Sequence, residues 1–165
     1  MDRCVECGFE YRLGEAERAG SDVVESALQL AAMLADARAD ARERRQPGIW
    51  SPLEYACHVR DVLLVQRERV LLARRQDRPS FDPMMGRDER VDHDGYAEQD
   101  PSDVASQLSD AARLFANVLG RLPAADWERT VMYNYPALAE RSLRWVGVHT
   151  LHELRHHLGD VRRQL

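Results

Sequence analysis

The chain has 165 residues, of which 44% are apolar and 31% charged, and its 28 acidic and 23 basic residues give a formal net charge of −5. This length fits one domain with its own buried core, so we predict a single domain over residues 1–165. No apolar run approaches the length of a membrane span, and no secretory signal is evident. The odd number of cysteines, three, favours a reducing compartment, and we expect a cytoplasmic protein.

The charge pattern narrows the range of partners. All 23 basic residues are arginine, and they do not gather into a basic segment. Because neutralised phosphates supply most of the affinity for duplex nucleic acid, we do not expect binding to it. The absence of lysine excludes Schiff-base chemistry. We therefore expect a small-molecule substrate, no nucleic-acid partner and no membrane partner. The sequence leaves open whether the chain forms a homodimer.

Two helices are predicted in the first half of the chain. The first covers residues 21–45, where apolar side chains recur every three or four positions. The second covers residues 51–76 and starts with a capping box formed by Ser51 and Glu54. Its apolar stripe includes a histidine, His58, which is unusual for a stripe that faces a core.

The second half begins with a long connection. Residues 77–99 show no periodicity, and connections of this length are usually functional or disordered. A third helix is predicted over residues 100–122, with Asp100 before its first turn, and a fourth over residues 141–165. No alternating pattern indicates a sheet. The four amphipathic helices predict an all-α fold, a four-helix bundle with a long crossover loop between the second and third helices.

The histidines carry the strongest chemical signal, because four of the six lie in the fourth helix. His152 and His156 are four residues apart, so both rings project from one face and can reach the same cation. His58 is the expected third ligand, from a helix that should face the fourth one. A second register is open, in which Glu153 and His157 face the metal. Three ligands on a divalent ion leave positions for water or substrate.

Two carboxylates could orient these rings. Asp61 lies one turn beyond His58, and Asp160 lies one turn beyond His156. Each could accept the second ring proton of its histidine and so fix the tautomer. A solvated helix charge is the alternative interpretation for each carboxylate.

Residues 1–20 form an N-terminal extension with a Cys-x2-Cys pair, Cys4 and Cys7. The pair resembles half of a zinc knuckle, but the sequence has no second cysteine pair. A tetrahedral site with two histidines is geometrically open, although no spacing supports it, and a redox dithiol is a further option. We favour an unpaired surface feature here. Cys57 is expected to pack on the second helix.

The sequence resembles the DinB-like superfamily of four-helix metalloproteins. The resemblance rests on residues 50–54 (WSPLE) leading to His58, and on residues 152–160 (HELRHHLGD), and it covers most of the chain. It implies a divalent metal, zinc or nickel, held by His58, His152 and His156. Related enzymes use low-molecular-weight thiols such as mycothiol or bacillithiol. Some isomerase relatives replace one histidine by glutamate, whereas the matching positions here are interpreted as three histidines.

The leading functional hypothesis is a metal-dependent thiol S-transferase or isomerase that acts on a small electrophile, with a low-molecular-weight thiol as cofactor. The alternatives are metal-assisted hydrolysis and a non-enzymatic metal-binding bundle. Candidate clamps for carboxylates of cofactor or substrate are Arg87, Arg90 and Arg141. Candidate pocket aromatics are Tyr133, Tyr135 and Trp145.

Overall fold

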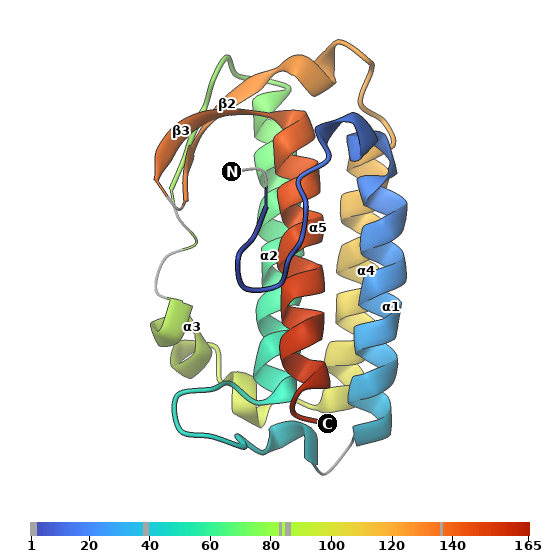
Figure 1. The fold of residues 1–165 in the computed structure, drawn as a ribbon, viewed down its shortest axis with the longest axis vertical. Helices are drawn as coiled ribbons and strands as arrows, with labels where there is room; N and C mark the ends of the chain where they lie inside the picture. Colours follow the sequence, from blue (N-terminus) through green and yellow to red (C-terminus); the bar gives the residue numbers. More distant parts are fainter. Residues whose placement is uncertain (1–2, 38–39, 83, 85–86, 136) are drawn as a thin grey trace.

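The computed structural model describes residues 3–37, 40–82, 84, 87–135 and 137–165, apart from the side chains of residues 87 and 88. Four long helices dominate the chain, and a short fifth helix lies in the crossover. They are α1 (Ala19–Ala37), α2 (Pro52–Ala73), α3 (Arg87–His93), α4 (Pro101–Leu119) and α5 (Leu143–Arg162). The predicted all-α class is confirmed, since the four long helices form the bundle (Figure 1).

The order of the helices around the bundle explains the long crossover. Both α1 and α2 pack against α4 and α5, whereas α1 and α2 touch each other little and occupy diagonal corners. Figure 1 shows that α1 and α5 run in one direction and that α2 and α4 run in the other. Because α2 and α4 are parallel, the chain must return along the whole bundle between them.

The helix starts follow the expected capping chemistry. Ser51 accepts a hydrogen bond from the backbone of Glu54, and the Glu54 carboxylate accepts one from the Ser51 backbone at 2.7 Å, which confirms the capping box. Asp100 caps α4, and Ser142 caps α5 through the Trp145 backbone at 3.2 Å. The first helix ends at Ala37, well before the predicted end, and a short 3-10 turn η2 (Asp40–Arg42) follows the undescribed residues 38–39.

A small sheet lies beside one end of α2, where irregular chain was predicted (Figure 1). It contains β1 (Ser80–Phe81), β2 (Thr130–Asn134) and β3 (Leu138–Ser142), with β1 parallel and β3 antiparallel to the central β2. The alternating burial along β2 spans only five residues, so the period-two signal was too short to recognise. The crossover also carries α3 and a 3-10 turn, η3 (Tyr96–Glu98).

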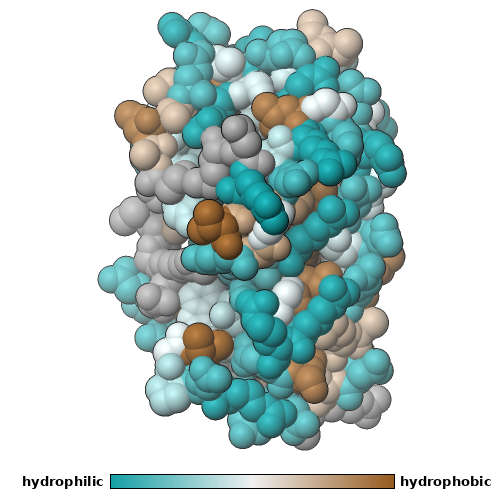
Figure 2. Space-filling model, viewed as in Figure 1, coloured by the Kyte–Doolittle hydropathy of each residue, from teal (hydrophilic) through white to brown (hydrophobic). Residues whose placement is uncertain are grey.

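The remaining short elements are two further 3-10 turns, η1 (Leu13–Arg18) and η4 (Asp126–Glu128). The predicted apolar stripes of α1 and α4 are buried at their centres, as Leu30 and Phe115 show. The coloured part of the face in Figure 2 is mostly hydrophilic, with scattered apolar side chains. None of the helices in the described residues has the length and apolar character of a membrane-spanning segment.

The N-terminal segment, residues 3–12, folds back along α5 (Figure 1). A bridge between Arg3 and Glu10 and a hydrogen bond from the Cys4 N–H to the Phe9 carbonyl at 2.8 Å make it a narrow turn. The Phe9 ring lies 5.3 Å from the ring of His152 on α5. The segment therefore covers the histidine-rich part of α5 and helps to build the site.

Candidate metal centre and adjoining cavity

Two neighbouring faces of α5 carry the side chains that could bind a metal. Glu153 and His157 lie on the face toward α2, where one ligand atom from each and one from His58 all lie within 4.8 Å of one another. His58 and His157 are buried, and their rings meet edge to face with centroids 5.1 Å apart. The preceding residues, His152 and His156, instead group with two cysteines of the N-terminal segment.

The predicted trio of His58, His152 and His156 is therefore divided between two groups in the described part of the chain. The second register, with Glu153 and His157, is the one that the structure brings to His58. A helix turns by about 100° per residue, so a shift of one position changes which face looks at α2. Apolar residues flank both registers and did not decide between them. Metal binding by the predicted trio stays a prediction.

Asp160 orients His157 rather than His156. Its Oδ2 accepts a hydrogen bond from His157 Nδ1 at 2.8 Å, while the distance to His156 Nε2 is 3.7 Å. Burial favours a raised pKa for Asp160, but the hydrogen bond and charge of His157 outweigh it and hold the pKa below the ordinary value. This arrangement leaves Nε2 of His157 for a metal, as is typical of carboxylate–histidine–metal sites.

Asp61 belongs to a network that anchors the crossover. It accepts hydrogen bonds from Arg60 at 2.8 Å, from Tyr96 at 2.6 Å and from Arg90 at 3.1 Å. Burial acts to raise the pKa of Asp61, but Arg60 and Tyr96 outweigh it, so the pKa lies below the ordinary value. Arg90, a predicted substrate clamp, also pairs with Asp94 at 3.2 Å, so its charge is engaged inside this network.

The electrostatics of α5 keep Glu153 ionised. Burial acts to raise its pKa, but the hydrogen bond from His152 and the charges of His149 and His157 outweigh it and bring the pKa to about 2. His149 shows the opposite response, because burial lowers its pKa to about 4. At neutral pH Glu153 therefore offers an ionised carboxylate oxygen as a metal ligand, whereas the neighbouring His149 is neutral.

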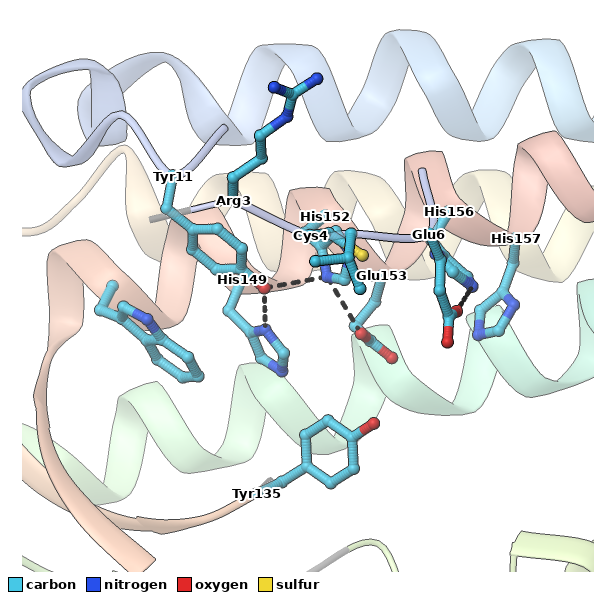
Figure 3. Close-up of a pocket in the computed structure, with 12 residues that line it drawn as sticks. Arg3, Cys4, Glu6, Tyr11, Tyr135, His149, His152, Glu153, His156 and His157 are labelled. Carbon is cyan, nitrogen blue, oxygen red and sulfur yellow. Dashed lines mark hydrogen bonds and ion pairs between the residues drawn. The ribbon is translucent and has the colours of Figure 1, made fainter. Parts of the chain in front are cut away.

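A cavity of about 410 Å³ lies between the N-terminal segment and α5 (Figure 3). This volume is typical of sites for small ligands. Glu153 and His157 reach its wall, so the cavity opens onto two members of the group with His58. Its other walls include Tyr11, Tyr135 and Trp145, which offer apolar ring faces.

Tyr11 is a site residue that sequence reasoning missed. Its hydroxyl lies 2.9 Å from Nδ1 of His149 and 3.0 Å from Nδ1 of His152, so the one hydroxyl links two histidines (Figure 3). His149 also stacks on Trp145 with ring centroids 4.4 Å apart. No local pattern indicates that a tyrosine of the extension meets α5.

Of the other residues predicted to line the pocket or to bind substrate, some line the cavity and others lie outside it. Tyr135 and Trp145 line the cavity as predicted. Tyr133 lies behind it, with its ring 5.5 Å from His149 and its hydroxyl accepting a hydrogen bond from Gln66 at 2.7 Å. The Arg141 guanidinium stacks over the Trp145 ring at 4.9 Å. The side chain of Arg87 lies outside the described residues.

Comparison with known proteins places this architecture in a family. The family model of the DinB superfamily matches residues 22–161. The chain belongs to the DinB superfamily. No curated protein matches it.

A solved four-helix bundle supports the same architecture. YfiT from Bacillus subtilis superposes with a TM-score of 0.71 over 88% of this chain and 85% of YfiT, at 15% sequence identity. YfiT is described as a probable metal-dependent hydrolase with an unusual four-helix bundle topology. At 15% sequence identity, this similarity shows that the present chain and YfiT share a fold.

Proposed function

We propose that this DinB superfamily protein is a metal-dependent enzyme that adds a small nucleophile to a small electrophile, with a divalent ion held by His58, Glu153 and His157. One observation carries the proposal: ligand atoms of two imidazoles and a carboxylate from facing helices lie within 4.8 Å of one another, and two of these side chains, Glu153 and His157, line a cavity. Three protein ligands of this kind leave a position open for a substrate atom, as in catalytic zinc sites.

The residues present fit such an ion. Metal ligands must be deprotonated, and the pKa of Glu153, about 2, keeps its carboxylate ionised. The hydrogen bond between His157 Nδ1 and Asp160 fixes the tautomer that frees Nε2. Imidazole and carboxylate donors suit zinc, and imidazole also suits nickel, so these two metals are the proposed cofactors.

The side chains that line the cavity can bind both the electrophile and the nucleophile. A divalent ion bound there supplies Lewis acidity, which favours the deprotonated form of a thiol or of water. Tyr11 and Trp145, whose rings are nearly parallel with centroids 6.0 Å apart, line the cavity and offer apolar ring surface to the electrophile. Arg3, at the cavity wall, can pair with a carboxylate of substrate or cofactor. The N-terminal segment limits access of bulk water from its side.

A low-molecular-weight thiol is the proposed nucleophile. The pair that faces His58 is a glutamate and a histidine, the pattern that the family resemblance associates with thiol-dependent isomerases. The cavity volume of about 410 Å³ is large enough for part of such a cofactor together with a small electrophile. Water is the second candidate, because YfiT, which has the same fold, is described as a probable metal-dependent hydrolase.

Parallel assays separate these reactions. The zinc-loaded or nickel-loaded protein is incubated with mycothiol or bacillithiol and an aryl halide, and separately with a p-nitrophenyl ester without thiol. Thiol-dependent formation of the aryl thioether supports the first proposal, and thiol-independent ester hydrolysis supports the second. Fully metal-loaded protein that is inactive in both assays would contradict an enzymatic role.

Matched variants connect any activity to the site. Glu153→Gln and His157→Gln should each lower turnover by more than about 100-fold, since even residues that only orient metal ligands cost 10–100-fold. His93→Gln is the control, because His93 is exposed on α3. Equal activity in all three variants would contradict the assigned site.

A further inference from the structure

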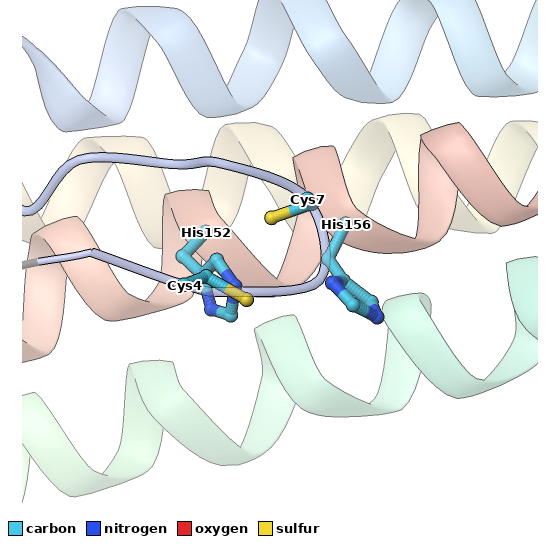
Figure 4. Close-up of side chains that lie close together, drawn as sticks. All are labelled: Cys4, Cys7, His152 and His156. Atoms are coloured by element: carbon cyan, nitrogen blue, oxygen red, sulfur yellow. The ribbon is translucent and has the colours of Figure 1, made fainter.

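We propose that Cys4, Cys7, His152 and His156 form a second metal site, a tetrahedral zinc centre that fastens the N-terminal segment to α5. One ligand atom from each of the four residues lies within 4.8 Å of the other three. Figure 4 shows the two cysteines on the turn of the segment, next to the two rings on α5. This proposal does not depend on the proposed function, because the two groups share no residue.

The backbone of the segment holds both thiols on one short turn. The Cys4 N–H donates to the Phe9 carbonyl at 2.8 Å, and the Gly8 N–H donates to the Cys4 carbonyl at 2.9 Å. Gly8 has a φ of +75°, a left-handed conformation that glycine adopts without strain. A closed turn of this kind brings both sulfur atoms of a Cys-x2-Cys pair to the same ion, as half of a zinc knuckle does.

The two histidines each keep one ring nitrogen available. His152 Nε2 and His156 Nδ1 are buried and have no hydrogen-bond partner among the described residues. The opposite nitrogens are engaged, because His152 Nδ1 lies 3.0 Å from the Tyr11 hydroxyl and His156 Nε2 lies 3.5 Å from Glu6. A buried polar atom without a partner is costly and rare, and coordination to a metal would satisfy both nitrogens.

The donor set selects the metal. Two thiolates and two imidazoles in a closed group are typical of structural zinc, whereas open sites with carboxylates are typical of catalytic metals. Only the spacing within each pair agrees with this chemistry, since two residues separate the cysteines and three separate the histidines, whereas the spacing between the pairs does not. The long stretch between the two pairs hid the combination in the sequence.

Such a centre would shape the cavity. The segment that it fastens carries Arg3 and Tyr11, which line the cavity beside Glu153. Among the described residues, the segment also contacts α5 through the Tyr11 hydroxyl, which bonds to His149 and His152, and through Glu6, which lies 3.5 Å from His156. Zinc at the four residues therefore stabilises one wall of the cavity without being part of the group with His58.

Cobalt substitution tests the proposal directly. Reduced, metal-free protein is titrated with Co²⁺, and both the bound equivalents and the near-ultraviolet thiolate-to-cobalt absorption are measured. The full chain should show the thiolate band. The double variant Cys4→Ser/Cys7→Ser, which removes both thiols of the group, should lose the band and bind one equivalent fewer than the unsubstituted chain. Cys57→Ala is the control and should keep both, because Cys57 is buried on α2 away from the turn.

The outcomes decide the proposal even if a variant fails to fold, because the spectrum of the unsubstituted chain is informative by itself. Saturation of that chain without a thiolate band overturns the proposal. A band that survives in the double cysteine variant also overturns it. His58→Gln should keep the band, and its loss there would mean that the two groups are not separate sites.

Discussion

Asp160 holds His157 by a 2.8 Å hydrogen bond to Nδ1, which leaves Nε2 as the ring nitrogen for the group that His157 forms with His58 and Glu153. The bond links residues three positions apart on one helix, and the rigid backbone between them fixes the geometry. Asp160 also pairs with Arg163. The carboxylate is therefore a positioning group for the candidate metal centre.

Asp160→Asn should weaken metal binding at this centre by about 10–100-fold, the usual cost of losing a residue that orients a metal-bound histidine. Competition with a chromophoric chelator measures the affinity. Asp110→Asn is the matched control, since Asp110 is an exposed α4 carboxylate that pairs with Arg113. An affinity for Asp160→Asn equal to that of the control would show that Asp160 does not orient a ligand.

Tyr11→Phe should lower the free energy of unfolding by about 1–3 kcal/mol, because it leaves two histidine nitrogens without their shared hydroxyl partner. Urea unfolding followed by circular dichroism measures the change. Tyr135→Phe serves as the comparison, because Tyr135 is 53% exposed and its hydroxyl can bind water. A loss no larger in Tyr11→Phe than in Tyr135→Phe would count against the link between the segment and α5.

Glu54→Gln should destabilise the protein at neutral pH by about 1–3 kcal/mol, since a charged hydrogen-bond partner of Arg44 and Ser51 is lost. Burial acts to raise the pKa of Glu54, but Arg44 and Ser51 outweigh it and the pKa lies below the ordinary value. The carboxylate therefore stabilises the fold above the ordinary glutamate pKa, and this contribution disappears as the pH falls through the lowered pKa.

Unfolding of both proteins over a series of pH values tests this expectation. The difference in unfolding free energy should be largest near neutrality and should shrink in acid. Glu68→Gln, at an exposed position on α2, is the control. A difference that stays constant into acid would mean that the ionised carboxylate is not what stabilises the start of α2.

The sequence predicted the bundle well because its signals are local. Capping at Ser51 and Asp100 depends on residues within one turn, and the apolar stripes repeat within each helix. The strands β2 and β3 were missed because each spans only five residues and their pairing depends on contacts between segments.

The candidate site was only partly predictable. Histidines on α2 and α5 were recognised, but the choice between His152–His156 and Glu153–His157 depends on how α5 is rotated against α2, which the apolar pattern did not fix. The contribution of the N-terminal segment was hidden, because Tyr11 meets His149 across more than a hundred residues of chain. Contacts of that separation leave no periodic trace in one sequence.

Anomalous diffraction from crystals of the zinc-loaded or nickel-loaded protein tests the central claim most directly. The account predicts a metal peak between α2 and α5, with His58, Glu153 and His157 each supplying a ligand atom at about 2.0–2.2 Å. A metal peak bound by His58 together with His152 and His156, or fully loaded crystals without a peak at His58, would contradict it.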